Sequence, residues 1–122
     1  MNITREEFDD YVQQAIESID PAFGPYLDEV PVIVEDNPDD VVCRDTKLDD
    51  PHCLLGVFRG LPLNKRSVHS AGYTNQIILY RRNILDRCRS RRQLLGRIRK
   101  TIIHELGHYL GFSEQQLRQH HH

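Results

Sequence analysis

The residues of this chain most able to do chemistry lie in the stretch HELGHYLGFSE, which covers residues 104–114. His104 and His108 are four residues apart, so on a helix they lie one turn apart on the same face. Two neutral imidazoles in this arrangement can bind one Zn²⁺ ion. Glu105 follows the first histidine and projects beside the metal position, where it can take a proton from a metal-bound water. The spacing therefore predicts a zinc site with a general base next to it.

A third zinc ligand is predicted at the end of the same stretch. Gly111 can end the helix in a left-handed turn, and that turn would swing Glu114 back towards the metal. A catalytic zinc site commonly has three protein ligands and one water. The alternative is that Glu114 is a solvated carboxylate in the first turn of a further helix, with Ser113 as its N-cap. In a shuffled chain the whole pattern arises with a chance of ~0.0003, which favours the metal site.

Residues 91–110 are predicted to form the helix that carries both histidines. Ser90 and Gln93 make a capping box at its start. At about 100° per residue, the histidines point in a different direction from the apolar side chains. We therefore expect the histidines to face a cleft while the apolar stripe packs against a sheet. The stripe consists of Leu94, Ile98, Ile102 and Leu106, joined by Leu95 and Tyr109.

The rest of the chain is predicted to supply a second long helix and a small sheet. Thr4 and Glu7 form a capping box for the first helix. Short apolar runs bounded by turn residues predict three strands. In chain order we expect a helix at about 5–19, a turn at 20–29, a strand at 30–35, a loop at 36–52, a strand at 53–58, a loop at 59–74, a strand at 75–80 and a short helix at 83–88.

Length and composition predict one globular domain in the cytoplasm. The chain has 122 residues, of which 39% are hydrophobic, and this suits a single core. No apolar run approaches the ~20 residues that a membrane span needs, and the N-terminus has no signal-peptide pattern. Three cysteines without a Cys-x-x-Cys pair fit reduced thiols, although a Cys43–Cys53 disulfide is the alternative. We expect the domain to cover residues 1–119, with His120–His122 as the remnant of an affinity tag.

Charge is unevenly distributed along the chain. Residues 1–60 carry 15 acidic and 4 basic residues, whereas residues 61–122 carry 3 acidic and 12 basic residues. We interpret this asymmetry as attraction between two halves of one domain. The alternative is a nucleic-acid-binding surface, since residues 81–100 contain nine Lys or Arg and one acid, Asp86. Because no aromatic residue beyond Tyr80 is interleaved there, base stacking is poorly supported.

Three stretches of the chain resemble the minimal zincin-like metallopeptidases, a family of small bacterial one-domain proteins. They are LLGVFRG at residues 54–60, LYRRNIL at 79–85 and HELGHYLGFSE at 104–114. The resemblance covers about residues 5–117. It implies an α/β (α+β) fold in which a small twisted mixed sheet packs on an N-terminal helix and a C-terminal metal-bearing helix. It also implies a zinc cofactor and the hydrolysis of peptide bonds.

The chain departs from this pattern at two positions. The minimal family favours Asp, and the related metzincins His or Asp, where this chain has Glu114. Glutamate is longer by one methylene group but keeps the oxygen donor. Metzincins also place a methionine turn beneath the metal, after the motif, whereas the only methionine here is Met1. The resemblance therefore describes a reduced relative that lacks this turn.

The resemblance also implies a substrate-binding strand. In zincins an edge strand near the cleft pairs with extended substrate, and the strand predicted at 75–80 precedes the metal helix. We expect Ile77, Ile78, Leu79 and Tyr80 to bind the peptide there through main-chain hydrogen bonds. A further group that stabilises the oxyanion is expected, and the candidates are His69, Tyr73 and Arg97.

Motif and resemblance together predict a zinc-dependent peptidase that acts on a peptide or protein substrate. Two rival functions remain. One is a zincin-like domain that binds zinc for stability or partner recognition without cutting, and the other is nucleic-acid binding through residues 81–100. Nothing in residues 104–114 favours the first rival, because Glu105 is present. The sequence indicates no membrane partner and leaves the oligomeric state open.

Overall fold

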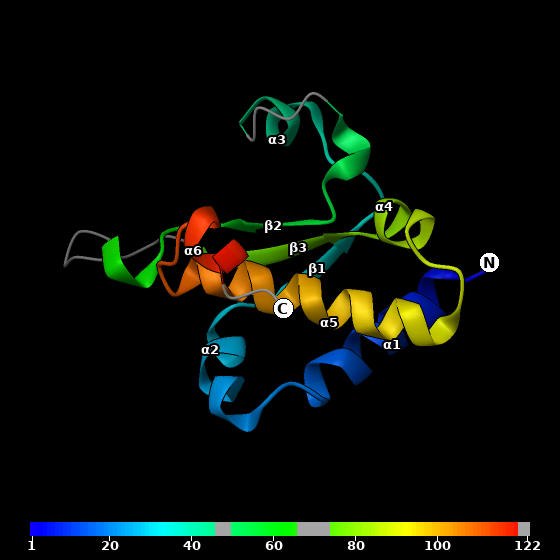
Figure 1. The fold of residues 1–122 in the computed structure, drawn as a ribbon, viewed down its shortest axis with the longest axis horizontal. Coiled ribbons are helices and arrows are strands. Elements are labelled where there is room, and N and C mark those ends of the chain that lie inside the picture. The colour runs from blue at the N-terminus through cyan, green and yellow to red at the C-terminus, as the bar shows by residue number, and fades with distance from the viewer. Residues whose placement is uncertain (46–49, 66–73, 120–122) are drawn as a thin grey trace.

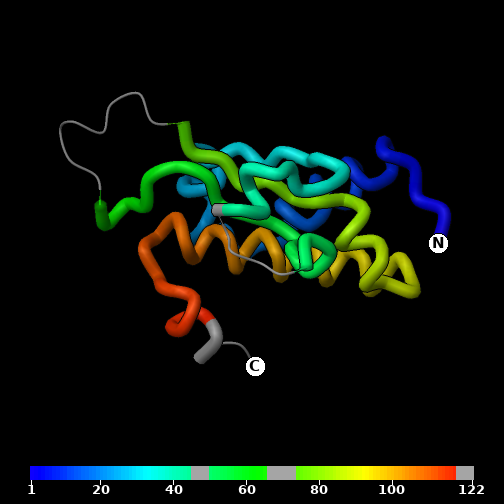
Figure 2. The backbone as a smooth tube through the Cα atoms, turned by 90° about the horizontal axis from the view of Figure 1, so that it is seen from above, coloured from blue at the N-terminus to red at the C-terminus, as the bar shows by residue number. Residues whose placement is uncertain are grey.

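A computed structural model of the chain describes residues 1–45, 50–65 and 74–119 (Figure 1 and Figure 2). Two long helices, a three-stranded sheet and several short helices make up this part of the chain. The helices are α1 (Arg5–Glu17), α2 (Gly24–Glu29), α3 (Asp40–Asp45), α4 (Arg81–Asp86), α5 (Arg91–Tyr109) and α6 (Glu114–Gln119). The strands are β1 (Val32–Glu35), β2 (Gly56–Arg59) and β3 (Gln76–Tyr80), and short 3₁₀ helices lie at Pro21–Phe23, Pro51–Cys53 and Leu63–Lys65.

The sheet is mixed, and its strand order is β1-β3-β2. β1 pairs with β3 in parallel, with Val32 opposite Ile77. β2 pairs with β3 in the antiparallel sense, with Gly56 opposite Leu79. A small mixed sheet with helices packed on it confirms the predicted α+β fold.

The main core lies between α1, α5 and one face of the sheet (Figure 1). The predicted apolar stripe of α5 is confirmed, since its four defining residues are all buried in this core. α1 adds three buried apolar side chains, and β3 adds the two side chains that point towards α5. These core residues are Phe8, Val12 and Ala15 from α1, Leu94, Ile98, Ile102 and Leu106 from α5, and Ile77 and Leu79 from β3.

A smaller cluster covers the opposite face of the sheet. Ile78 and Tyr80 of β3 point away from α5 and pack against Val42 of α3. The period of two along a strand explains this division, because successive side chains point to opposite faces. β3 is therefore buried on both faces, which fits its nearly continuous run of apolar residues.

The prediction that residues 20–29 form a turn is wrong, because a 3₁₀ helix and α2 lie there. Asp20 accepts a hydrogen bond from the Ala22 amide at 2.9 Å and caps the first of them. Pro21 and Pro25 both stand in a first helical turn, where the missing amide hydrogen costs no hydrogen bond. The prolines that suggested a break therefore mark helix starts.

Residues 36–52, predicted as a loop, contain α3. Asp39 accepts a hydrogen bond from the Val42 amide at 2.8 Å, and Val42 itself is buried. The Asp39 cap and the buried Val42 side chain hold this acidic segment against the sheet. Nearby, Cys53 carries a free thiol, so the alternative disulfide to Cys43 is not formed.

Ion pairs join the acidic and basic halves of the chain, as the charge asymmetry suggested. Arg81 lies 2.9 Å from Asp36, and Arg91 lies 2.9 Å from Glu7. The hydrogen bond from the Arg81 guanidinium holds the pKa of Asp36 below its ordinary value. In the described ranges, no helix combines the length and apolarity that a bilayer crossing demands.

Two neighbouring isoleucines on α5 offer a matched test of this packing. Ile102→Ala is expected to lower the free energy of unfolding by ~2–5 kcal/mol, because the side chain is fully buried and leaves a cavity. Ile103→Ala should cost less than ~1 kcal/mol, since that side chain is 39% exposed. Urea denaturation followed by circular dichroism measures both values. Equal losses for the two variants would contradict the orientation of α5.

Candidate metal centre

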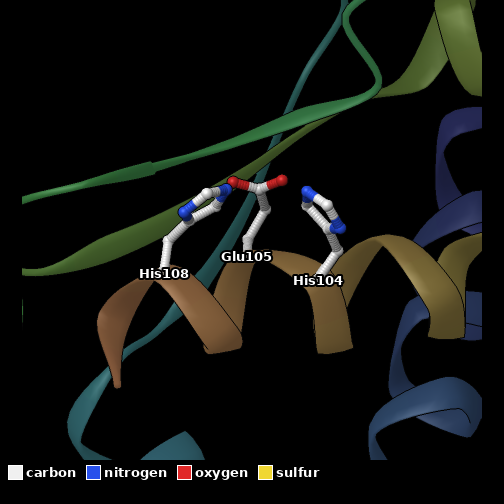
Figure 3. Close-up of side chains that lie close together, drawn as sticks. All are labelled: His104, Glu105 and His108. Carbon is white, nitrogen blue, oxygen red and sulfur yellow. The ribbon is translucent and has the colours of Figure 1, made fainter. Parts of the chain in front are cut away.

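His104 and His108 stand on successive turns of α5 and point to the same side of the helix. Figure 3 shows both rings, with Glu105 between them, rising from α5 towards the strands. The two ring centroids are 5.1 Å apart, and the ring planes are nearly perpendicular. The predicted geometry of two imidazoles on one helical face is therefore present, and ligand atoms of the three residues lie within 4.8 Å of one another.

Glu114 contacts both histidines. Its Oε1 lies 3.0 Å from His104 Nε2, and its Oε2 lies 2.8 Å from His108 Nε2. Partial burial raises the pKa of Glu114, but the hydrogen bonds and charges of the two histidines together outweigh it, so that the pKa lies below its ordinary value. Two imidazole nitrogens and one carboxylate oxygen thus converge on one point at the mouth of the cleft.

The turn that returns Glu114 is built around Gly111. This residue has φ +100°, in the left-handed region that favours glycine. The Gly111 amide donates to the His108 carbonyl at 3.0 Å, and the Phe112 amide donates to the Gly107 carbonyl at 3.0 Å. These two bonds form a Schellman motif. The predicted left-handed ending of the metal helix is therefore confirmed.

The turn is also closed from outside by Asn64. A Cβ atom added at Gly111 would lie only 2.5–2.8 Å from three side-chain atoms of Asn64. The positive φ favours glycine at this position, and any larger residue would also have to displace the Asn64 side chain. After this turn the chain returns towards α5, and Glu114 contacts both histidines.

Both sequence interpretations of residues 113–114 are partly realised. Ser113 Oγ accepts from the Gln116 amide at 3.2 Å, and Gln116 Oε1 accepts from the Ser113 amide at 2.8 Å. Ser113 is thus an N-cap, and Glu114 is the first residue of α6. Its carboxylate is nevertheless turned to His104 and His108 rather than to solvent alone.

The donor set fits zinc by chemical type. Two histidines and one glutamate, with a fourth position for water, form a recognised catalytic zinc set. Glu114 Oε2 lies 3.1 Å from His104 Nε2 and 2.8 Å from His108 Nε2, so the three donor groups are already gathered at one place. His104, His108 and Glu114 are therefore the residues that could hold the metal.

Glu105 is buried beside this donor set. Its Oε1 accepts a hydrogen bond from the Phe58 amide of β2 at 3.0 Å. Burial raises the pKa of Glu105 to about 8, the Phe58 hydrogen bond opposes this shift, and the charge of Glu114 adds to it. A divalent cation bound next to it would favour the ionised carboxylate and bring that pKa down.

The histidines face a cleft, as predicted. A cavity of about 1100 Å³ lies over the metal centre, between α5 and the segment that contains β2. Phe58 anchors the wall of this cavity, because its amide bonds Glu105 and its ring packs 5.5 Å from that of Tyr109. The Tyr109 hydroxyl donates to Glu29 at 2.6 Å and so ties α5 to α2.

The expectation that the strand at 75–80 is an edge strand is wrong. β3 lies in the middle of the sheet, and Ile77, Ile78, Leu79 and Tyr80 are buried between β1 and β2. Their backbone groups pair with the neighbouring strands and cannot receive a peptide. The apolar run correctly indicated a strand, but it was the run of a strand enclosed on all sides.

The strand at the edge beside the cleft is β2. The Tyr80 amide donates to the Leu55 carbonyl, and antiparallel pairing alternates from there along β2. Gly56 and Phe58 therefore turn their backbone groups away from β3. The Phe58 amide that reaches Glu105 is one of these groups. Sequence analysis missed this contact because a backbone amide carries no residue signature.

Of the three oxyanion candidates, Arg97 lines the cleft. It precedes His104 by seven residues, or ~10 Å along the helix axis, so it is remote from the reacting position. His69 and Tyr73 lie outside the described residues, as do His120–His122.

Comparison with models of protein families matches residues 27–122 to the zincin-like metallopeptidases. The match covers most of the chain and includes every residue of the metal centre. The chain therefore belongs to the zincin-like metallopeptidase family, and this membership implies zinc binding. Comparison with curated proteins gives no match.

Glu114→Ala, in protein lacking His120–His122, is expected to weaken zinc binding by at least ~100-fold. Loss of an outer partner of a ligand commonly costs ~10–100-fold, and loss of a ligand should cost no less. Competition with a chromophoric zinc chelator measures the affinity. Gln115→Ala is the matched control, because Gln115 is the exposed neighbour of Glu114. Glu114→Asp should retain zinc, whereas an alanine variant with wild-type affinity would place the third ligand elsewhere.

Proposed function

We propose that this protein is a zinc-dependent peptidase with a glutamate general base. The observation that carries this proposal is the contact of Glu114 with both His104 and His108, beside a buried Glu105 in a cleft. Family membership supports the same chemistry. His104, His108 and Glu114 would hold the metal, and Glu105 would move the proton.

When bound, zinc would polarise the scissile carbonyl and lower the pKa of a bound water towards ~7. Glu105 accepts the proton as the water oxygen bonds to the carbonyl carbon. It then gives that proton to the amide nitrogen as the carbon–nitrogen bond breaks. The Phe58 amide fixes Oε1 of Glu105, which leaves the second carboxylate oxygen for these transfers.

The substrate would be an extended peptide added to the free edge of β2. The backbone of Gly56 and the carbonyl of Phe58 face that edge, next to the candidate metal centre, whereas the Phe58 amide is already bonded to Glu105. Pairing at a sheet edge uses main-chain hydrogen bonds and depends little on the substrate's side chains. The edge of β2 would therefore favour any peptide in an extended conformation. A peptide held in this way would lie along β2 in the cleft with one peptide bond beside Glu105.

The non-catalytic alternative is less well supported, because Glu105 is present, buried and oriented by Phe58. Nucleic-acid binding through residues 81–100 is weakened by intramolecular contacts. Arg81 and Arg91 pair with acids, and Arg99 donates to Ser18 Oγ at 2.8 Å. The cytoplasmic location stays a prediction from the cysteines.

Glu105→Gln is expected to retain zinc and the fold but to lower the rate of peptide hydrolysis by ~10²–10⁴-fold. The amide is nearly isosteric with the carboxylate and cannot take a proton. Cleavage of a denatured protein such as casein, followed by mass spectrometry of the products, measures the rate. Metal analysis and circular dichroism of the same samples provide the control. Wild-type cleavage by the glutamine variant would remove Glu105 from the mechanism.

A further inference from the structure

Basic side chains border the metal cleft along the N-terminal half of α5. Arg97 and Lys100 line the main cavity together with the metal-centre residues. The same two side chains line a second cavity of about 580 Å³, to which Arg87 and Arg89 also contribute. The two cavities therefore meet at Arg97 and Lys100. We refer to these four residues as the cationic cluster.

The cationic cluster is not neutralised by the described parts of the protein. All four side chains are exposed, and none forms an ion pair within residues 1–45, 50–65 and 74–119. By contrast, Arg81 and Arg91 of the same basic run are paired with acids. Among the described residues that line either cavity, the acids all belong to the metal centre. The end of the cleft at Arg97 and Lys100 therefore carries two cations with no ion pair among the described residues, whereas the Gly111 end has one described lining cation, Lys65.

The cleft has a polarity because β2 and α5 run side by side in the same direction. Gly56 lies against Thr101, and further along the Phe58 amide bonds Glu105. A peptide added antiparallel to β2 would continue the pairing of β2 with β3, and antiparallel pairing is slightly the more stable. Such a peptide runs opposite to α5. Its residues after the scissile bond then extend from Glu105 towards the cationic cluster.

Helix geometry gives the reach of the nearest cations. Lys100 and Arg97 precede His104 by four and seven residues, or ~6 and ~10 Å along the axis at about 1.5 Å per residue. An extended peptide advances ~3.3 Å per residue. These two cations therefore lie level with about the second and third residues after the scissile bond.

On the basis of the peptidase function above, we infer that the cationic cluster selects peptides with Asp or Glu at these two positions. A substrate carboxylate can form charge-assisted hydrogen bonds with Arg97 or Lys100. Arg87 and Arg89 extend the same preference to acidic residues of the peptide that lie further from the scissile bond on its C-terminal side. Because the cations are exposed, each pair contributes modestly, and the result is a graded preference rather than an absolute requirement.

An acidic peptide fits the cluster better than a nucleic acid does. None of the described residues that line the second cavity is aromatic, so no stacking platform accompanies the cations. The large exposed aromatic side chain of the metal cleft, Phe112, lies beyond Gly111 at the opposite end. The cluster is also continuous with a strand edge, which offers hydrogen bonds to a peptide backbone.

The test compares three short fluorescein-labelled peptides that share one alanine-based frame. One carries a central Leu followed by two adjacent Glu residues, so that the pair falls at the second and third places when Leu is the first residue after the scissile bond. One carries Gln at the same places, and one carries the Glu pair before the Leu. Binding to the zinc-loaded Glu105→Gln protein is measured by fluorescence anisotropy, so that turnover does not interfere. The peptide with Glu after the Leu should bind at least about fivefold more tightly than the Gln peptide, with a preference that weakens in high salt.

The double variant R97Q/K100Q should reduce this preference to less than about twofold. R82Q/R92Q is the matched control, because it removes the same charge from exposed residues of the same run that line neither cavity. Equal binding of the Glu and Gln peptides, or a preference that survives R97Q/K100Q, would overturn the inference. Tighter binding of the peptide with Glu before the Leu would overturn the inference that the acidic residues lie after the scissile bond.

Two further measurements separate this inference from its alternatives. A single-stranded oligonucleotide that binds more tightly than the acidic peptide, and loses affinity in R97Q/K100Q, would assign the cluster to nucleic acid and overturn it. Cleavage of the unlabelled acidic peptide by the wild-type protein is followed separately. Intact binding preference without any cleavage would support selection of acidic peptides by the cluster and count against the catalytic proposal alone.

Discussion

The burial of one face of α5 is the constraint on which the metal centre depends. Ile98 and Ile102 are fully buried against α1 and the sheet, and a rigid helix that buries this stripe cannot rotate. The helical period then places His104 and His108 on a different side, above the cleft. The core thus fixes the direction of the two imidazoles without contacting the ring nitrogens that would bind a metal.

The carboxylates around this helix experience two different environments. Glu105 is withdrawn from water and raised in pKa to about 8, whereas the histidines hold the pKa of the half-exposed Glu114 low. The two described carboxylates that line the cleft lie at the candidate metal centre. Of the described Lys and Arg residues that line the cleft, Arg97 and Lys100 lie along α5 at one end, and Lys65 lies next to Asn64 at the Gly111 end. This uneven distribution of charge gives the cleft an electrostatic direction as well as a steric one. A bound dication would complete it by compensating the two carboxylates.

The errors of the sequence analysis have a common physical origin. An apolar run such as Ile77–Tyr80 indicates a strand, but strand order depends on which segments pair, and pairing is not local. Prolines at positions 21 and 25 suggested a turn, although the first turn of a helix accepts them. Asp39 similarly suggested a loop and instead caps α3. In each case the local conformation that the residue favours is present in the structure. Contacts with other parts of the chain decided which element that conformation belongs to.

The sequence by itself determined the two long helices, the apolar stripe, the histidine pair and the left-handed turn at Gly111, because all of these rest on local spacing. Only the tertiary structure decided that β2 borders the cleft and that its Phe58 amide, 47 residues away, orients Glu105. It also decided which cations of residues 81–100 are paired and which remain along the cleft. Contacts between residues distant in sequence follow from the packing of whole elements, and no spacing rule encodes them.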